Sequence, residues 1–436
     1  MTSFEILIKS LGYDIEKAQN DLQNVQSLNT AEFHDWQNEQ KWENALYHYK
    51  NNQYYRNKVG SHFPNKWEDL PIMEKTDFQN DLNKIVTKGL KKNDIYISNT
   101  SGSSGHPFYF AKNKYSHAMA WALIKNRYSW YDLKINSKQA RFFGIPLEHS
   151  ISRYKELFKD YIMNRVRFPI FDLSDKTFES FLSKFERINF EYIYGYTNSL
   201  VLFARYLLDK NIVLKEKCEG LKVCIPTSET VTSEDKNLMS AAFGIDIINE
   251  YGISEVGGIV AFEDSSKNWN LSSEIQFHEL DKNTNIDEES AGDIIITDLF
   301  NKAMPFIRYR AGDIASFHNN KFDKNNYPLL KNILGRTNDN VILPDGTTSP
   351  GLTFYYISRS ILESSGILKE FIIRQVAMDS FVFDIVSDRE LNENEIKQIN
   401  EKMAIYLQPG LNLKINRVNK IVRPESGKIK HFYSEI

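Results

Sequence analysis

Apolar residues recur along this chain in patterns that change at about residues 94 and 291. The first ~90 residues are polar and carry apolar and aromatic residues at helical spacing. From residue 94 onward, short apolar runs alternate with helical segments. The alternation predicts strands at 95–97, 190–194, 221–225 and 246–249, and helices at 115–128, 197–209 and 233–243. Repeated strand–helix units predict the α/β class with a largely parallel sheet.

Beyond residue 291 the pattern becomes strand-rich. It predicts strands at 293–297, 307–309 and 313–317. A final region then predicts, in order, a helix at 352–364, strands at 370–376 and 380–386, a helix at 392–407 and a strand at 412–418. That order suits a small, mobile α+β domain. We therefore expect a large N-terminal domain of several subdomains at 1–337, including a helical lead-in at 1–90, and a small C-terminal lid domain at 338–436.

Composition places the chain among ordinary globular proteins. It has 436 residues, of which 41% are hydrophobic and 25% charged, and its net charge is −3. This balance gives no argument for a nucleic-acid or anionic-membrane partner. No apolar run reaches the roughly 18 residues of a membrane-spanning helix, and the N-terminus lacks the layout of a secretory signal, so we expect a cytoplasmic protein. Cys218 and Cys224 fit two small buried residues better than a disulfide or half of a metal site.

A segment rich in hydroxyls and glycines is the first candidate for chemistry. It follows the apolar alternation at 95–97 and precedes the helix predicted at 115–128. Hydroxyls and free N–H groups on such a loop could hold phosphate, although a solvated linker has the same composition. No Gly-Lys-Ser/Thr closes it, so it is not a Walker loop. Its residues are Thr100, Ser101, Gly102, Ser103, Ser104 and Gly105.

A second candidate is the segment at 249–255, which follows a short apolar strand. It reads Asn-Glu-Tyr-Gly-Ile-Ser-Glu. The ring of Tyr251 could stack on a purine, and the carboxylate of Glu255 could hold a hard cation such as Mg²⁺. The same two side chains could also flank an ordinary surface turn.

Three further charged turns follow along the chain. Asp313 comes after a glycine at a predicted strand and could accept hydrogen bonds from ribose hydroxyls, or form a structural salt bridge. Arg336 could contact phosphate or ribose, in a short polar turn that also suits a hinge or a plain linker. Lys428, on a glycine-containing segment near the C-terminus, could reach a reacting phosphate ester, or belong to a solvated tail.

In their order and spacing, these five segments resemble the motifs of the adenylate-forming superfamily. That superfamily contains acyl-CoA synthetases, firefly luciferase and the adenylation domains of peptide synthetases. The resemblance spans about residues 95–432. Segments 192–200 and 227–230 are similar to the phenylacetate–CoA ligase-like branch, particularly members associated with capsular polysaccharide synthesis. Phe108 stands where relatives often have a lysine, and Asn338 where they have a hinge Asp or Lys.

The resemblance implies ATP-dependent activation of a carboxylic acid as an acyl-adenylate, with release of pyrophosphate. Transfer to a thiol, with coenzyme A as the first choice, would follow. The alternative is an amide ligase that joins the acid to an amino acid or amino sugar without CoA. A third reading is a non-catalytic nucleotide-binding protein, against which the joint presence of Glu255, Asp313 and Lys428 argues. The acid would be a small aryl or polar one.

The resemblance also implies residue roles. Lys428 and Glu255 would be catalytic, with Glu255 holding Mg²⁺ and Lys428 bridging carboxylate and phosphate oxygens. The ATP or AMP site would comprise Thr100, Ser101, Gly102, Ser103, Ser104, Gly105, Ser228, Glu229, Thr230, Asn249, Tyr251, Gly252, Ser254, Asp313 and Arg336. The acyl pocket would include His149, Tyr194 and Gly195, and the hinge would lie at Asn338 or Asp339.

Overall fold

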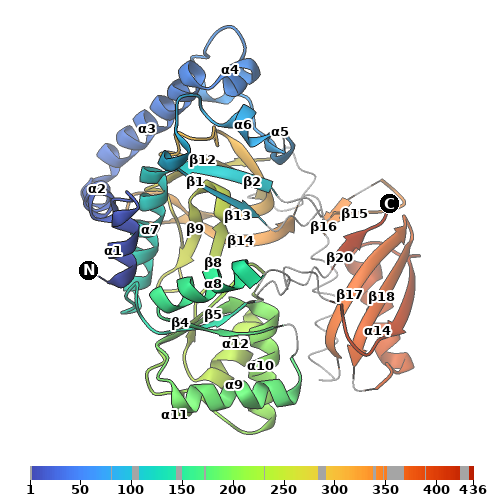
Figure 1. Ribbon diagram of the computed structural model, residues 1–436. Helices are drawn as coiled ribbons and strands as arrows, with labels where there is room; N and C mark the ends of the chain where they lie inside the picture. Colours follow the sequence, from blue (N-terminus) through green and yellow to red (C-terminus); the bar gives the residue numbers. More distant parts are fainter. Residues whose placement is uncertain are drawn as a thin grey trace. The chain divides into compact units, whose positions relative to one another are not determined.

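The chain belongs to the α/β class, as predicted, and forms two compact units (Figure 1). The first unit comprises Met1–Asp281, Ile294–Ala311 and Phe317–Lys331, and the second comprises Lys282–Asp293, Gly312–Ser316 and Asn332–Ile436. The computed structural model describes residues 2–79, 81–100, 108–143, 150–170, 173–229, 231–282, 291–336, 340–346, 348–350, 368–387, 389–422 and 432–436.

Helices dominate the first ~90 residues. The long helix α3 begins at a capping box, in which the Asn29 side chain accepts from the Glu32 backbone and Glu32 accepts from the Asn29 backbone. Its buried Asn44 donates to the Asp298 carbonyl at 2.6 Å, so α3 is tied to the strand that carries Asp298. The helices are α1 (Ser3–Ser10), α2 (Ile15–Ser27), α3 (Thr30–Asn51), α4 (Gln53–Val59), α5 (Lys75–Phe78) and α6 (Leu82–Ile85), with 3₁₀ turns at Trp67–Asp69 and Lys92–Asp94.

A five-stranded parallel sheet follows from the predicted strand–helix units. Its order is β4-β3-β5-β6-β7, and the predicted helices at 197–209 and 233–243 match α10 and α12. The strands are β3 (Gln139–Phe142), β4 (Arg165–Phe168), β5 (Tyr192–Tyr196), β6 (Val223–Thr227) and β7 (Asp246–Ile247). The helices around it are α8 (Ser150–Ile162), α9 (Asp175–Arg187), α10 (Thr197–Asp209), α11 (Leu214–Lys217) and α12 (Ser233–Phe243).

Phenylalanines fill the core on one face of this parallel sheet. Phe142 of β3 and Phe168 of β4 stack with ring centroids 4.7 Å apart. Phe181 of α9 and Phe203 of α10 pack their rings against Phe142. Because strand side chains alternate between faces, this core leaves the residues in between, such as Arg141, on the opposite face.

The largest sheet is not parallel throughout. Its seven strands lie in the order β11-β12-β13-β14-β10-β9-β8, and β8, β9, β10 and β14 pair antiparallel. The strand predicted at 313–317 and the last residue of the one predicted at 307–309 belong to one long strand, β13, whose chain continues through Gly312 at φ +80°. The strands are β8 (Glu250–Ile253), β9 (Gly258–Glu263), β10 (Trp269–Leu271), β11 (Gln276–Asp281), β12 (Ala291–Asp298), β13 (Tyr309–Phe322) and β14 (Pro328–Arg336), with a 3₁₀ turn, η3 (Ser254–Val256), after β8.

The expected order of strand, phosphate loop and helix needs correction. β1 (Ile95–Thr100) pairs antiparallel with an unpredicted strand, β2 (Phe108–Asn113), and helix α7 (Lys114–Ser129) begins only after β2. The apolar part of β2 is short, and the last residue of the strand, Asn113, is also the N-cap of α7. No loop separates the two elements, so periodicity alone did not resolve them. The chain therefore leads from the glycine-rich segment into a strand rather than into a helix N-terminus.

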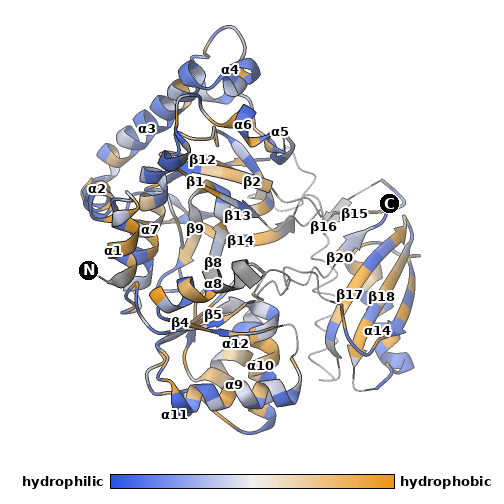
Figure 2. Ribbon diagram, in the orientation of Figure 1, coloured by the Kyte–Doolittle hydropathy of each residue, from blue (hydrophilic) through white to orange (hydrophobic). Residues whose placement is uncertain are grey.

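The second unit contains an α+β arrangement of the predicted kind. Its four-stranded sheet has the order β19-β18-β17-β20, and alternate residues of β18 are buried. Most residues of β18 are apolar, and the strand is largely orange in Figure 2. Its elements are β15 (Asn340–Ile342), β16 (Thr348–Pro350), β17 (Leu368–Ala377), β18 (Ser380–Ser387), α14 (Glu393–Tyr406), β19 (Asn412–Arg417) and β20 (Phe432–Ser434). The helix predicted at 352–364 lies outside the described residues.

Two sequence expectations about individual residues can be checked directly. Cys218 and Cys224 are both free and buried, which confirms the interpretation as small core residues. No helix among the described residues is long and apolar enough to cross a bilayer.

Gly195 of β5 has a packing reason to be glycine. A Cβ at this position would lie 2.4 Å from Phe142 Cβ and 2.8 Å from the Phe142 carbonyl oxygen on the neighbouring strand. We expect Gly195→Ala to force β3 and β5 apart and to lower the free energy of unfolding by about 1–3 kcal/mol, the usual cost of overpacking. Urea denaturation of both proteins measures this, and an unchanged midpoint would contradict the packing.

Candidate functional site

The carboxylate of Glu250 joins the parallel sheet to the larger sheet. Glu250 is the first residue of β8, and its Oε1 accepts a hydrogen bond from the Tyr194 hydroxyl of β5 at 2.8 Å. The same oxygen accepts from Thr227 at the end of β6 at 3.2 Å, and Oε2 accepts from the Tyr128 hydroxyl of α7 at 3.3 Å. One side chain thus gathers two strands of the parallel sheet and one helix around the start of β8.

The surroundings of Glu250 favour its neutral form. Burial raises the pKa of the Glu250 carboxyl, against the opposing effects of the three hydroxyl donors and of Arg141. Sequence analysis did not single out Glu250, although it stands between Asn249 and Tyr251 in a predicted site segment. The sequence feature that could have identified Glu250 is its position as an acidic residue directly after a short apolar strand.

Glu255 lies in the turn η3 that follows β8. Its side chain is buried, and its Oε1 accepts from the Tyr309 hydroxyl at 3.1 Å. Beside it, the ammonium of Lys112 from β2 donates to the Ser254 carbonyl at 2.6 Å. Burial lowers the pKa of Lys112 to about 8, against the attraction of Asp298 and Glu255. The predicted carboxylate therefore lies in a buried polar region with a cation close by, which sequence analysis missed.

A divalent cation fits the donor chemistry of Glu255. Nucleotide-bound Mg²⁺ is held by one or two carboxylates together with phosphates and water, rather than by a complete protein cage. Oε2 of Glu255 accepts no hydrogen bond from the described residues, and no group of three His, Cys, Asp or Glu side chains placed to hold a metal is found among them. Glu255 can supply one carboxylate oxygen of such a set.

Ser228 and Glu229 follow the carboxyl end of β6, where ligands of parallel sheets bind. Ser228 is exposed and adopts φ +69°, a backbone conformation unusual for a residue with a side chain. The Glu229 carboxylate accepts from the Asn198 backbone N–H in the first turn of α10 at 2.8 Å. The Glu229 backbone carbonyl accepts from the Thr197 hydroxyl at 3.3 Å, so carboxylate and carbonyl together hold this loop against α10.

Four residues of the predicted nucleotide site lie on or beside β8, namely Asn249, Tyr251, Gly252 and Ser254. The Asn249 backbone N–H donates to Glu263 at 2.9 Å, and Asn249 lines a polar cavity of about 180 Å³ together with Lys236 and Lys331. Tyr251 is half-buried, and Gly252 is exposed. A Cβ added to Gly252 would lie 3.2 Å from the Gly258 carbonyl oxygen, which is a tight contact. Tyr251 and Gly252 share β8 with Glu250, Asn249 directly precedes the strand, and Ser254 opens η3 directly after it.

Tyr194, predicted to line the acyl pocket, lies on the polar face of the parallel sheet. Its ring stacks on Phe143 with centroids 5.5 Å apart, and the Arg141 guanidinium lies 5.3 Å from the Tyr194 ring centre. Gly195, on the same strand, faces Phe142 instead, so the structure gives it a packing role. Arg141 is a further residue that sequence analysis did not identify.

The other predicted residues lie on β1, β13 and β14 or fall outside the described residues. Asp313, buried within β13, and Arg336, the last residue of β14, belong to the second unit, and Thr100 ends β1 in the first. The predicted residues outside the described part are Ser101, Gly102, Ser103, Ser104, Gly105, His149, Thr230, Asn338, Asp339 and Lys428.

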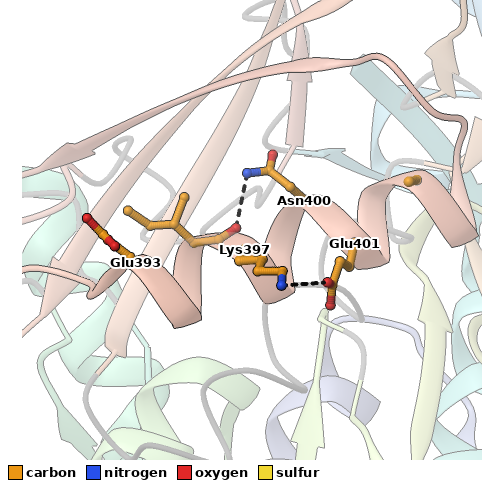
Figure 3. Close-up of a pocket in the computed structure, with 6 residues that line it drawn as sticks. Glu393, Lys397, Asn400 and Glu401 are labelled. Atoms are coloured by element: carbon orange, nitrogen blue, oxygen red, sulfur yellow. Dashed lines mark hydrogen bonds and ion pairs between the residues drawn. The ribbon is translucent and has the colours of Figure 1, made fainter.

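A larger hollow, about 540 Å³, lies on the outer face of α14 (Figure 3). Its lining comes from this one helix, where Lys397 pairs with Glu401 at 3.8 Å and Asn400 donates to the Ile396 carbonyl at 3.1 Å. A single exposed helix face with internally paired groups offers no converging donors for a small ligand. The residues around Glu250 and Glu255 remain the candidate site.

Comparisons with known proteins agree with this fold. No protein-family model matches the chain. Protein CapK of Staphylococcus aureus is 23% identical over 376 residues, which cover 82% of this chain and 78% of that protein. A crystal structure of 2-hydroxyisobutyryl-CoA ligase in the postadenylation state with R3-HIB-AMP matches with a TM-score of 0.71 at 16% identity, over 94% of this chain and 91% of that one.

A second kind of ligase has the same fold. The amide bond synthetase McbA from Marinactinospora thermotolerans matches with a TM-score of 0.53 at 13% identity, covering 77% of this chain and 68% of that one. The fold of the chain is therefore that of adenylate-forming ligases, which confirms the resemblance first seen in the motifs. This fold therefore occurs in both thioester-forming and amide-forming enzymes.

The raised pKa of Glu250 predicts a pH dependence of stability. The folded state holds the Glu250 proton above the usual pKa near 4.5, so the contribution of this group is largest below that pH and falls as the pH rises through it. We expect the stability of Glu250→Gln, relative to the natural protein, to increase as the pH is raised from about 4.5 to 7. Urea denaturation at several pH values measures this.

The exposed Glu16, paired only with Lys9 at the surface, provides the matched control. Glu16→Gln should show no comparable increase. A stability difference for Glu250→Gln that stays constant or falls over the same pH range would contradict the buried, protonated carboxyl.

Proposed function

We propose that this protein is an AMP-forming ligase of the phenylacetate–CoA ligase-like branch. It would activate a small aryl or polar carboxylic acid with ATP and then transfer the acyl group to a thiol, most simply that of coenzyme A. The similarity to Protein CapK supports the capsular branch of that group. The observation that carries the proposal is Glu255, a buried carboxylate directly after the strand of Tyr251, within an adenylate-forming ligase fold. One of its oxygens accepts no hydrogen bond from the residues that the structure describes.

In the first half-reaction, an oxygen of the substrate carboxylate attacks the α-phosphorus of ATP. The new bond gives an acyl-adenylate, while the bond to the β-phosphate oxygen breaks and pyrophosphate leaves. Negative charge grows on the phosphate oxygens, so fixed cations and N–H donors accelerate the step. Glu255 would hold Mg²⁺, which supplies positive charge to those oxygens. Lys428 would contribute a second cation that bridges the substrate carboxylate and the α-phosphate.

The nucleoside would be bound by the remaining predicted residues. The Tyr251 ring and the backbone at 228–230 would frame adenine, Asp313 and Arg336 would contact ribose, and the segment at 100–105 would bind the β- and γ-phosphates. Glu250 touches no nucleotide in this account. It is a positioning residue, because its hydrogen bonds fix Tyr194 and the end of β6 relative to β8.

The second half-reaction attaches the acyl group to a thiol sulfur or an amine nitrogen and releases AMP. The resemblance implies that the small domain rotates between the two half-reactions, and Lys428 would then leave the reacting phosphate. An amine acceptor, with an amino acid or amino sugar as its source, is the alternative, and McbA shows that the fold accommodates an amide-forming enzyme.

A pyrophosphate-release screen over carboxylic acids tests the proposal. Each acid is assayed with ATP and Mg²⁺, alone and with coenzyme A or candidate amines. We expect acid-dependent pyrophosphate release, with thioester formed when coenzyme A is present. If product forms only with an amine, the protein is the amide ligase of the alternative. If no acid gives pyrophosphate release, the proposed adenylation is contradicted.

Glu255→Gln tests the proposed metal role. An amide is a weaker ligand for Mg²⁺ than a carboxylate, so we expect the Mg²⁺ concentration for half-maximal pyrophosphate release to rise about tenfold or more. Glu16→Gln, which changes an exposed surface carboxylate, is the control. Natural metal dependence in the Glu255 variant would remove this residue from the metal site.

Lys428→Ala tests the proposed catalytic role of the lysine near the C-terminus. Loss of a cation that acts on the transition state should reduce pyrophosphate release by about 100-fold or more, with ATP binding nearly retained. Lys397→Ala changes an exposed lysine of α14 and serves as the control. If Lys428→Ala releases pyrophosphate at the natural rate, its assigned role is wrong.

A further inference from the structure

Three arginines share the polar face of the parallel sheet. Arg141 of β3 pairs in register with Arg167 of β4, and Gln139 of β3 pairs with Arg165. Since side chains alternate along a strand, these four residues lie on the face opposite the buried Phe142 and Phe168. Three positive charges on one partly buried sheet face require compensation.

Two of these arginines have carboxylate partners. Arg165 donates from Nε to Asp160 at 2.6 Å, and Arg167 pairs with both Asp160 and Glu156. These carboxylates come from α8, which packs beside β4. Arg165 and Arg167 are therefore neutralised by residues of the protein itself.

Arg141 has no such partner among the described residues. Its Nη1 donates to the Gln139 side chain at 3.3 Å, and its Nε is buried without a hydrogen-bond acceptor. No carboxylate of the described chain lies within ion-pair distance of it. Arginine stays protonated at all physiological pH values, so this positive charge persists.

Aromatic rings hold the guanidinium of Arg141 in place. It lies 4.1 Å from the ring centre of Phe143 and 5.3 Å from that of Tyr194. Contacts with two aromatic rings orient the planar fork before any ligand arrives, which reduces the entropy lost on binding. The Arg141 side chain remains partly exposed, so a ligand can reach it.

Glu250, which is hydrogen-bonded to Tyr194, interacts electrostatically with Arg141. Burial raises the pKa of Glu250, so its carboxyl compensates the arginine charge incompletely. Burial and repulsion by Arg141 together lower the pKa of Arg165 to about 10, as expected beside a guanidinium that has no carboxylate partner among the described residues. This part of the sheet face carries excess positive charge next to a predicted acyl-pocket residue.

We propose that Arg141 is a specificity-determining residue that binds a second carboxylate of the acid substrate, at the end away from the reacting group. The substrate class is therefore dicarboxylic acids, which the guanidinium fork of Arg141 recognises through paired N–H donors. This inference rests on the proposed adenylating function and on Tyr194 lining its acyl pocket.

The test compares acids that differ only in the second carboxylate. Pyrophosphate release is measured with succinate against butyrate, glutarate against pentanoate, and isophthalate against benzoate. The natural protein should show the higher kcat/KM with the dicarboxylic member of at least one pair. Arg141→Met should lower that dicarboxylate-to-monocarboxylate ratio by about 10- to 100-fold, the usual effect of losing hydrogen bonds to a charged group.

Two further variants separate specificity from folding. Arg141→Lys keeps the charge without the planar fork and should give an intermediate ratio. Arg187→Met removes an exposed arginine at the end of α9 and should leave the ratio unchanged. Calorimetric titration of the preferred dicarboxylate into each protein provides a readout independent of turnover, in which Arg141→Met should weaken binding by a similar factor.

The outcomes distinguish the two claims. Pyrophosphate release with monocarboxylic acids but with no dicarboxylic acid would overturn the role of Arg141 and leave the adenylating function standing. An unchanged ratio in a folded Arg141→Met protein would do the same. No pyrophosphate release and no binding with any acid would contradict both the proposed function and this inference.

Discussion

A buried carboxylate that accepts hydrogen bonds from three hydroxyl groups is the constraint on which the site depends. Glu250 stands where the parallel sheet meets the larger sheet, and its partners come from β5, β6 and α7. A buried acid without donors is costly, so each hydroxyl fixes the position of its own element relative to β8. Because β8 also carries Tyr251 and leads into the turn of Glu255, the same contacts position the candidate nucleotide residues.

The parallel sheet has different functions on its two faces. One face packs phenylalanines from β3, β4 and the surrounding helices, and Gly195 is part of that packing. The other face presents Arg141, Arg165, Arg167 and Tyr194, charged or polar residues at alternate positions. Strand alternation places a rigid apolar core directly behind the polar residues, and this arrangement preorganises their side chains.

Local patterns predicted the helices and the parallel sheet well. Helices α10 and α12 match their predicted ranges, because each lies between short apolar strands of the kind the pattern predicts. Strand β2 was missed because its last residue is the N-cap of the following helix and no loop separates the two elements. Strand β13 was divided at a glycine that the strand accommodates. The sequence could not identify three residues of the site, since their roles arise from contacts with residues far away along the chain. They are Glu250, Lys112 and Arg141. The motif residues came from resemblance, and among them Glu255 and Tyr194 lie in buried polar surroundings that suit a site.

The central claim is that the chain forms an acyl-adenylate, whichever acceptor follows. Acid-dependent exchange of radiolabelled pyrophosphate into ATP measures this reversible step without any acceptor present. The account predicts exchange that requires ATP, Mg²⁺ and a carboxylic acid and that disappears when the acid is omitted. Absence of exchange across a broad panel of acids, with a folded protein that binds ATP, would contradict it.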